Sequence, residues 1–176
     1  MPASLVDMLD LKLGWKRTKL DFPERTFVRL PHEIELIEMD LDNWLNSIRT
    51  GIQNNTYYPQ PAIICDVPKA GGTLRPTAYL NLSDRVMYAA CIGACFPHIY
   101  RAVYWTNEIA DFSNPLSPNV DDPAWIRNQF HLWRRFSEES IREIDKGASY
   151  VVVADISGYY ENIDISILIS DLRQTD

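Results

Sequence analysis

The residue with the clearest chemical potential is Asp155, where a hydrophobic run gives way to a turn. Residues 150–155 read Tyr-Val-Val-Val-Ala-Asp, and the β-branched valines predict a buried strand that ends at the carboxylate. A carboxylate at a strand end, with a backbone carbonyl beside it in the turn, is half of a site for a hard cation such as Mg²⁺. The alternative is structural, because many α/β proteins use such an aspartate only to cap the next helix.

Two further residues with chemical potential, a lysine and an arginine, lie in residues 62–79, whose pattern predicts a β-hairpin. Two β-prone runs flank the loop Pro-Lys-Ala-Gly-Gly, whose paired glycines permit the positive φ angles of tight connections. Lys69 lies in the loop and Arg75 in the returning run, so both cations can face one anion. A triphosphate suits them, since arginine is a forked donor and lysine a mobile point charge. The alternative is an ordinary exposed hairpin with solvated ends.

Together the two stretches resemble the reverse transcriptase family. Residues 155–160, Asp-Ile-Ser-Gly-Tyr-Tyr, are similar to the first catalytic motif of the polymerase palm, in which an aromatic follows the aspartate five residues later. Ahead of it, in the family's order, come residues similar to the fingers motifs: Pro68-Lys69, Gly72, Arg75-Pro76 and Asp84-Arg85-Val86. Two matches in the family's order are more specific than either short motif alone.

The resemblance implies RNA-templated DNA synthesis, in which a primer 3′ hydroxyl attacks the α-phosphate of a deoxynucleoside triphosphate. It implies that Asp155 is the catalytic carboxylate and a ligand of two Mg²⁺ ions, with the backbone carbonyl of Ile156 as a further ligand. Ile156 and Tyr160 would contact the nucleotide, and Tyr160 would exclude a 2′ hydroxyl from the sugar site. Lys69 and Arg75 would contact its phosphates. The implied partners are an RNA template, a DNA or RNA primer and deoxynucleoside triphosphates.

Composition and charge narrow the class of protein. The 176 residues, 46% hydrophobic and 23% charged, suit one globular domain with a core. A formal net charge of −7 argues against nucleic-acid binding through the overall field, so such contacts must be local. Three clusters combine cations with a nearby aromatic: residues 15–19, Arg25 with Arg29, and residues 133–135. For each, the alternative is an ordinary solvated surface.

Membrane and secretory classes are not indicated. No run approaches the ~20 consecutive apolar residues of a membrane span, and the N-terminus does not read as a signal peptide. Three cysteines, an odd number, fit a reducing compartment better than a disulfide framework. We therefore expect a cytoplasmic protein without a membrane partner.

The predicted elements give an α+β fold, a right-hand polymerase fragment. Mainly helical fingers with the β-hairpin, over residues 1–147, lead into the first palm strand and the start of the palm, over residues 148–176, as one continuous body without a clear linker. The helices expected from periodicity and capping signals are a first one from Ser4 stopped by Gly14, one or two over 34–52, one from Asn81 to Pro97, and one from Asp122 to Gly147.

The second palm motif of the family, an aromatic followed by Xaa-Asp-Asp, does not occur in the sequence. We therefore expect a truncated or split reading frame that is inactive alone, with the remaining palm supplied by a longer chain or a second polypeptide. Within the family the chain looks closest to bacterial enzymes of abortive infection and phage defence, although retrons, group II introns and retroelement enzymes share the broad motifs. The alternatives are a non-catalytic module that binds nucleic acid or a partner protein, and a nucleotide-binding regulator that uses only the hairpin.

Overall fold

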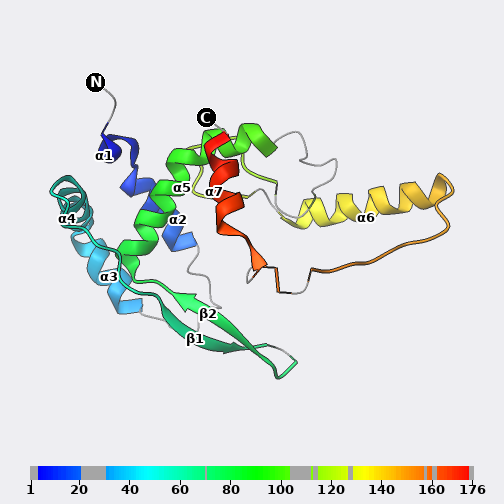
Figure 1. The fold of residues 1–176 in the computed structure, drawn as a ribbon, viewed down its shortest axis with the longest axis horizontal. Coiled ribbons are helices and arrows are strands. Elements are labelled where there is room, and N and C mark those ends of the chain that lie inside the picture. Colours follow the sequence, from blue (N-terminus) through cyan, green and yellow to red (C-terminus); the bar gives the residue numbers. More distant parts are fainter. Residues whose placement is uncertain are drawn as a thin grey trace. The chain divides into compact units, whose positions relative to one another are not determined.

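The chain is an α+β protein of helices and one antiparallel β-hairpin, and it divides into two compact units, Met1–Cys95 and Phe96–Asp176 (Figure 1). A computed structural model describes residues 4–20, 31–69, 71–103, 112, 115–126, 129–156, 158–159 and 162–174. The helices are α1 (Leu5–Met8), α2 (Leu11–Leu20), α3 (Pro31–Met39), α4 (Leu41–Gln53), α5 (Leu82–Val103), α6 (Gln129–Asp145) and α7 (Ile165–Gln174). The strands are β1 (Ile63–Pro68) and β2 (Leu74–Tyr79).

The core of the first unit lies where the apolar faces of its helices meet. Its buried members are Leu9, Leu11, Trp15, Leu45, Ile48, Leu82, Val86 and Ala90. Trp15 is 1% exposed, and its ring meets that of Trp44 edge to face at 5.4 Å between centroids. The Trp15 indole N–H also donates to the Glu38 carboxylate at 2.9 Å, so the buried ring keeps a partner for its polar atom.

Gly14 does not end a helix, contrary to the sequence prediction, but lies buried inside α2. A Cβ at this position would lie 2.8 Å from the Val86 carbonyl oxygen and 3.3 Å from the Ala90 Cβ of α5. The missing side chain therefore serves a close approach of two helices rather than a helix stop. The predicted first helix is divided instead into α1 and α2, and Ser4 precedes α1 with its N–H bonded to the Asp7 carboxylate at 3.2 Å.

Two further helix predictions are resolved by the structure. The region over 34–52 forms two helices, α3 and α4, which join at Asp40. Pro97 does not end α5, since the helix continues to Val103 and loses at Pro97 only the bond that an imide nitrogen cannot donate.

Among the described residues, helix α5 is long and apolar enough to cross a membrane by length and composition alone, with a mean hydropathy of 1.2 over 18 residues, although it holds no run of ~20 consecutive apolar residues. A core helix passes the same test. Leu82, Val86 and Ala90 of α5 lie in the core of the first unit.

The N-terminus of α5 carries a polar cluster centred on Asp84. Asn81 caps the helix as predicted, because its Oδ1 accepts the Asp84 N–H at 2.8 Å. The buried Asp84 carboxylate accepts the Tyr57 hydroxyl on one oxygen and the Gln60 N–H, at 2.9 Å, on the other. One carboxylate thus joins the start of α5 to residues more than twenty positions earlier in the chain.

Burial, followed by the hydrogen bond to Asp84, raises the pKa of Tyr57 above its ordinary value of 10.0. A raised acid pKa means that the folded state favours the neutral phenol, so this contribution to stability is complete below pH 10 and is lost as the pH rises above it. We expect the melting temperature of the wild-type chain to fall more between pH 9 and pH 11 than that of Tyr57→Phe. Equal falls in the two proteins would contradict this assignment.

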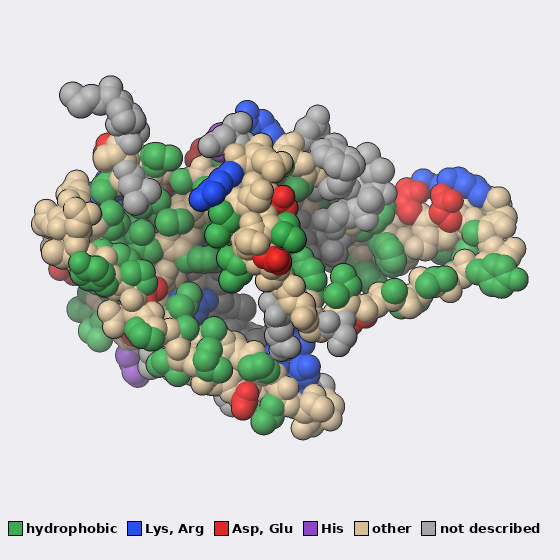
Figure 2. Space-filling model, viewed as in Figure 1, with side chains coloured by type: hydrophobic (Ala, Val, Ile, Leu, Met, Phe, Trp, Pro, Cys, Tyr) green, Lys and Arg blue, Asp and Glu red, His purple; other side chains and the backbone are tan. Residues whose placement is uncertain are grey.

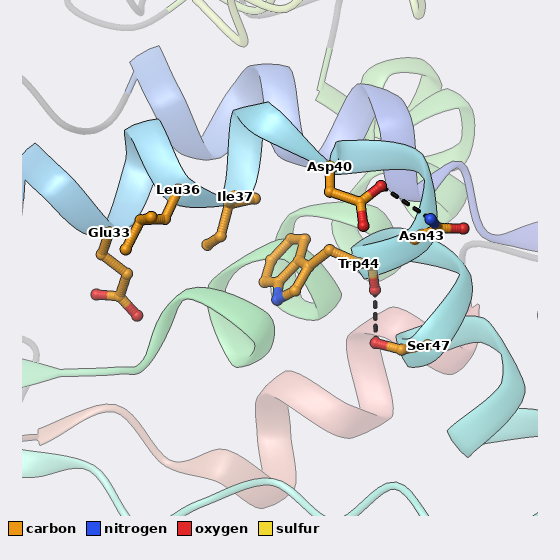
Figure 3. Close-up of a pocket in the computed structure, with 7 residues that line it drawn as sticks. All are labelled: Glu33, Leu36, Ile37, Asp40, Asn43, Trp44 and Ser47. Carbon is orange, nitrogen blue, oxygen red and sulfur yellow. Dashed lines mark hydrogen bonds between the residues drawn. The ribbon is translucent and has the colours of Figure 1, made fainter.

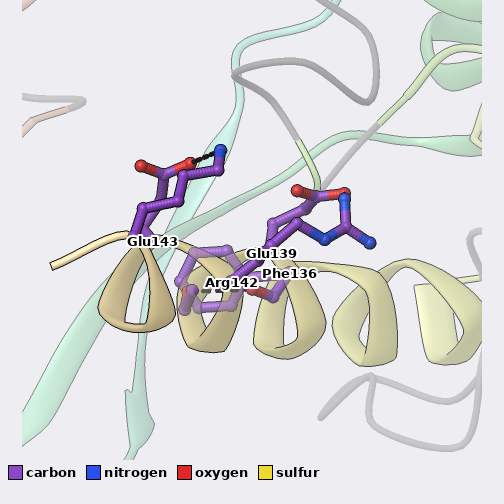
Figure 4. A network of polar contacts seen from close by, with 6 residues as sticks. Phe136, Glu139, Arg142 and Glu143 are labelled. Carbon is purple, nitrogen blue, oxygen red and sulfur yellow. Dashed lines mark hydrogen bonds and ion pairs between the residues drawn. The ribbon is translucent and has the colours of Figure 1, made fainter. Parts of the chain in front are cut away.

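The second unit contains α6, α7 and the segment between them. Helix α6 begins at Gln129 rather than at the predicted cap Asp122. The helical spacing of Phe130, Trp133, Ile141 and Ile144 in the sequence predicts that they face inward, but all four are exposed. Two ion pairs lie on its surface, each between residues about one helical turn apart: Glu139 with Arg142 at 2.7 Å and Glu143 with Lys146 at 2.6 Å (Figure 4). Gly147, with φ +104, ends α6 as predicted.

Candidate functional site

The register of the β-hairpin places the two predicted phosphate ligands on one face. β1 and β2 pair antiparallel with Val67 opposite Arg75, and the Lys69 N–H donates to the Thr73 carbonyl at 2.7 Å, which continues the ladder by one pair. Because side chains alternate between faces, Lys69 follows Val67 on the face that also carries Arg75. The two cations are therefore diagonal cross-strand neighbours, whose Cα atoms typically lie about 7–8 Å apart.

This face of the hairpin is cationic and open. The single acid of residues 62–79 is Asp66, which lies opposite Pro76 and so belongs to the other face. Lys69 and Arg75 are exposed, and neither forms an ion pair with any residue that the structure describes. Gly72, with φ +77, makes the tight connection between the strands. The predicted hairpin is confirmed, and its use for a triphosphate stays a prediction.

Most of the basic cluster at residues 15–19 is buried or paired, so little of it is open to a nucleic acid, and its use as such a site stays a prediction. Trp15, Arg17 and Thr18 are buried, and Lys19 pairs with Glu38 at 2.5 Å. The cluster contributes instead to the core of the first unit. Arg25 and Arg29 lie outside the described residues.

The third cluster, residues 133–135, lies on α6, where the Trp133 ring is exposed and packs on one side against the Phe136 ring at 5.5 Å between centroids. Arg134 forms an ion pair with Glu138 at 2.9 Å, so one of the two arginines in this cluster is already neutralised by a carboxylate.

The predicted palm strand is not formed in the described structure. Residues 150–156 have no strand partner among the described residues, and Val151, Val152 and Val153 are 73%, 88% and 92% exposed. Figure 2 shows apolar side chains standing out along this segment. A strand forms only when a neighbour satisfies its N–H and C=O groups, and β-propensity does not supply that neighbour. The valine run therefore has the composition of a buried strand but neither the burial nor the strand partner of one among the described residues.

Asp155 is exposed at the end of this extended segment, and its Oδ1 accepts the N–H of Ile156 at 2.9 Å. Gly158 adopts φ +61 in the turn that follows, as its sequence position suggests. Tyr160 lies outside the described residues. Lys69 and Arg75 belong to the first unit, whereas Asp155 and Ile156 belong to the second.

Asp164 precedes apolar residues at helical spacing in the sequence, which predicts a helix with Asp164 as its cap, and it does cap α7. Its Oδ1 accepts the Ser166 hydroxyl at 2.5 Å and the Ser166 N–H at 2.8 Å. These hydrogen bonds lower the pKa of Asp164, and the bond from the Ser166 hydroxyl has the largest effect. The capping role that Asp155 could have had is thus filled by another residue. The apolar side chains Ile165, Leu168, Ile169 and Leu172 of α7 are exposed.

The donor chemistry at Asp155 fits one ligand position of a hard cation, because a carboxylate and a backbone carbonyl are oxygen ligands. No group of three candidate metal ligands occurs among the residues that the structure describes. Asp155 and Ile156 can contribute only part of a site for two Mg²⁺ ions.

A groove of about 460 Å³ lies along α3 and α4 (Figure 3). Leu36, Ile37 and Trp44 give it an apolar surface, and the carboxylates of Glu33 and Asp40 lie at its edge. The two acids would repel phosphate groups, so the groove does not suit a nucleotide. Neither this groove nor the Asp84 cluster leaves a signal in the sequence, because each depends on how distant segments pack.

Comparisons of the chain with protein-family models, with curated proteins and with solved structures gave no match.

Proposed function

We propose that this chain forms the fingers and the start of the palm of an RNA-directed DNA polymerase. The observation that carries the proposal is the hairpin register, which gathers Lys69 and Arg75 on a face without an acid. The order of the sequence motifs supports it, since the hairpin precedes the Asp155 motif as it does in reverse transcriptases. In this account the hairpin face binds the triphosphate of an incoming deoxynucleotide.

Each residue of the proposed site has a distinct task. Arg75 offers a planar pair of donors to two phosphate oxygens, and Lys69 adds a mobile positive charge beside it. Asp155 and the Ile156 carbonyl would hold Mg²⁺, which supplies neutralisation of phosphate charge in this class of reaction. Tyr160 would exclude a ribose 2′ hydroxyl.

The remaining parts of the proposal follow from the sequence resemblance. They are an RNA template, a DNA or RNA primer, a cytoplasmic location, a role in antiviral defence, and further palm carboxylates from a longer chain or a second polypeptide.

Primer extension tests the function directly. A polymerase that contains this chain is expected to extend a primer on an RNA template with deoxynucleotides and Mg²⁺, giving a product complementary to the template. Omitting the template should abolish extension. Omitting one deoxynucleotide should stop extension at the first template position that requires it. A folded protein that contains this chain and the remaining palm, binds deoxynucleotides and extends no primer would contradict the polymerase assignment.

That last outcome would favour the second candidate, a nucleotide-binding regulator. The favouring observation is that both hairpin cations lie in the first unit and need no residue of the second for their placement. Such a protein would bind a triphosphate through Lys69 and Arg75 and would not require Asp155. Affinity for triphosphate that is unchanged by Asp155→Asn, without any synthesis, is its expected signature.

A further inference from the structure

We propose that Asp84 is a positioning residue that fixes the direction of the β1–β2 hairpin and thereby sets how well Lys69 and Arg75 bind a triphosphate. The second half of this inference rests on the proposed function, and the first half does not. Asp84 lies at the root of the hairpin, bonded to residues just before β1 and just after β2.

Both roots of the hairpin converge on Asp84. Gln60, just before β1, donates its backbone N–H to one carboxylate oxygen at 2.9 Å. Asn81, just after β2, accepts the Asp84 backbone N–H at 2.8 Å. The entering and the leaving chain are therefore bonded to the same residue of α5. Tyr57 adds a third attachment through its hydroxyl, on the other oxygen of the carboxylate.

Beyond its roots the hairpin has little else to hold it. Of its residues that the structure describes, nearly all are exposed, and only Cys65, Val67 and Tyr79 are partly buried. A two-stranded hairpin is marginally stable by itself and takes its orientation from whatever it is attached to. The hydrogen bonds at Asp84 are thus the main polar restraint on the direction of the two strands.

The restraint is a strong one because the acceptor is charged and buried. Hydrogen bonds to an ionised group are shorter and roughly twice as strong as neutral ones. Ser83 reinforces the cluster, since its hydroxyl donates to the Asn81 Oδ1 at 2.8 Å. Removing the Tyr57 hydroxyl therefore weakens one attachment and leaves the others to keep the fold.

The test compares Tyr57→Phe with Tyr58→Phe, which removes the hydroxyl of the neighbouring, 74% exposed tyrosine. Both are made in a background in which Cys65, Cys91 and Cys95 are serine, with spin labels on Gly71→Cys at the hairpin loop and Asn46→Cys on α4. No atom lies within 4 Å of a Cβ at Gly71, so a label there has space. The readouts are the distance distribution between the labels, the dissociation constant for dTTP and the melting temperature.

We expect Tyr57→Phe to broaden the distance distribution and to weaken dTTP binding roughly threefold to tenfold. The reason is that binding then has to order a more mobile hairpin, which costs conformational entropy. Tyr58→Phe should leave both values at those of the background protein. Asp84→Asn, which also removes the oxygen that accepts the Gln60 N–H, is measured beside them and should broaden the distribution further. An unchanged distribution in both Tyr57→Phe and Asp84→Asn overturns the positioning role, and a broadened distribution with unchanged affinity overturns the link to binding. If the background protein binds no dTTP, the proposed function and that link both fail, while the distance distribution still decides whether Asp84 holds the hairpin.

Discussion

Replacing Asp155 with asparagine is expected to lower primer extension by a polymerase that contains this chain about a thousandfold or more. Asparagine keeps the shape of the side chain and removes the negative charge that a hard cation requires of its ligand. The loss corresponds to several kcal/mol of charge stabilisation, at about 1.4 kcal/mol for each factor of ten. The measurement is the single-turnover rate of nucleotide addition at saturating deoxynucleotide, for the wild type and the variant.

Asp171→Asn is the matched control, since Asp171 is an exposed acid on α7 in the same unit. Its rate should stay within about twofold of the wild-type rate. If Asp155→Asn extended the primer at a rate within about twofold of the wild-type rate, Asp155 would not be a metal ligand. The roles proposed for Asp155 and Ile156 would then have to be abandoned.

Gly14→Ala is expected to destabilise the first unit by a net of roughly 1–2 kcal/mol, because forcing an atom against a backbone oxygen costs about 2–3 kcal/mol, the upper part of the usual overpacking range. The new Cβ would lie 2.8 Å from a backbone oxygen of Val86, so α2 and α5 have to move apart. The gain in helix propensity, about 1 kcal/mol for glycine to alanine, offsets only part of this cost. Urea denaturation measures the difference in free energy of unfolding.

Gly51→Ala is its control, because Gly51 is also helical and its Cβ would meet Tyr57 Cβ at an ordinary contact distance of 3.4 Å. That variant should be as stable as the wild type or slightly more so, from propensity alone. If Gly14→Ala were equally stable, the close helix approach would not be a determinant of the fold.

The features that the sequence predicts correctly depend on neighbouring residues. The hairpin follows from two β-prone runs around paired glycines, and the caps at Asn81 and Asp164 follow from a side chain two or three positions from the amide that it accepts. Such signals are local, so they survive without knowledge of the tertiary structure.

The features that the sequence misjudges depend on distant partners. Residues 150–155 have the composition of a buried strand, but pairing needs a neighbour that no local pattern specifies. Arg17 reads as a surface cation and is buried, and Gly14 reads as a helix stop and is a point of contact between helices. The role of Asp84 depends on Tyr57 and Gln60, which are too far away in the sequence for a pattern to connect them.

Equilibrium binding of dTTP to this 176-residue chain tests most directly the claim that the hairpin face is a triphosphate site. Each charge-assisted contact contributes about 1.5–3 kcal/mol, so Arg75→Ala and Lys69→Ala are each expected to weaken binding about tenfold or more, and the double variant further. Lys16→Ala removes an exposed cation of α2 and should bind as the wild type does. A double variant that binds dTTP within twofold of the wild type would contradict the account.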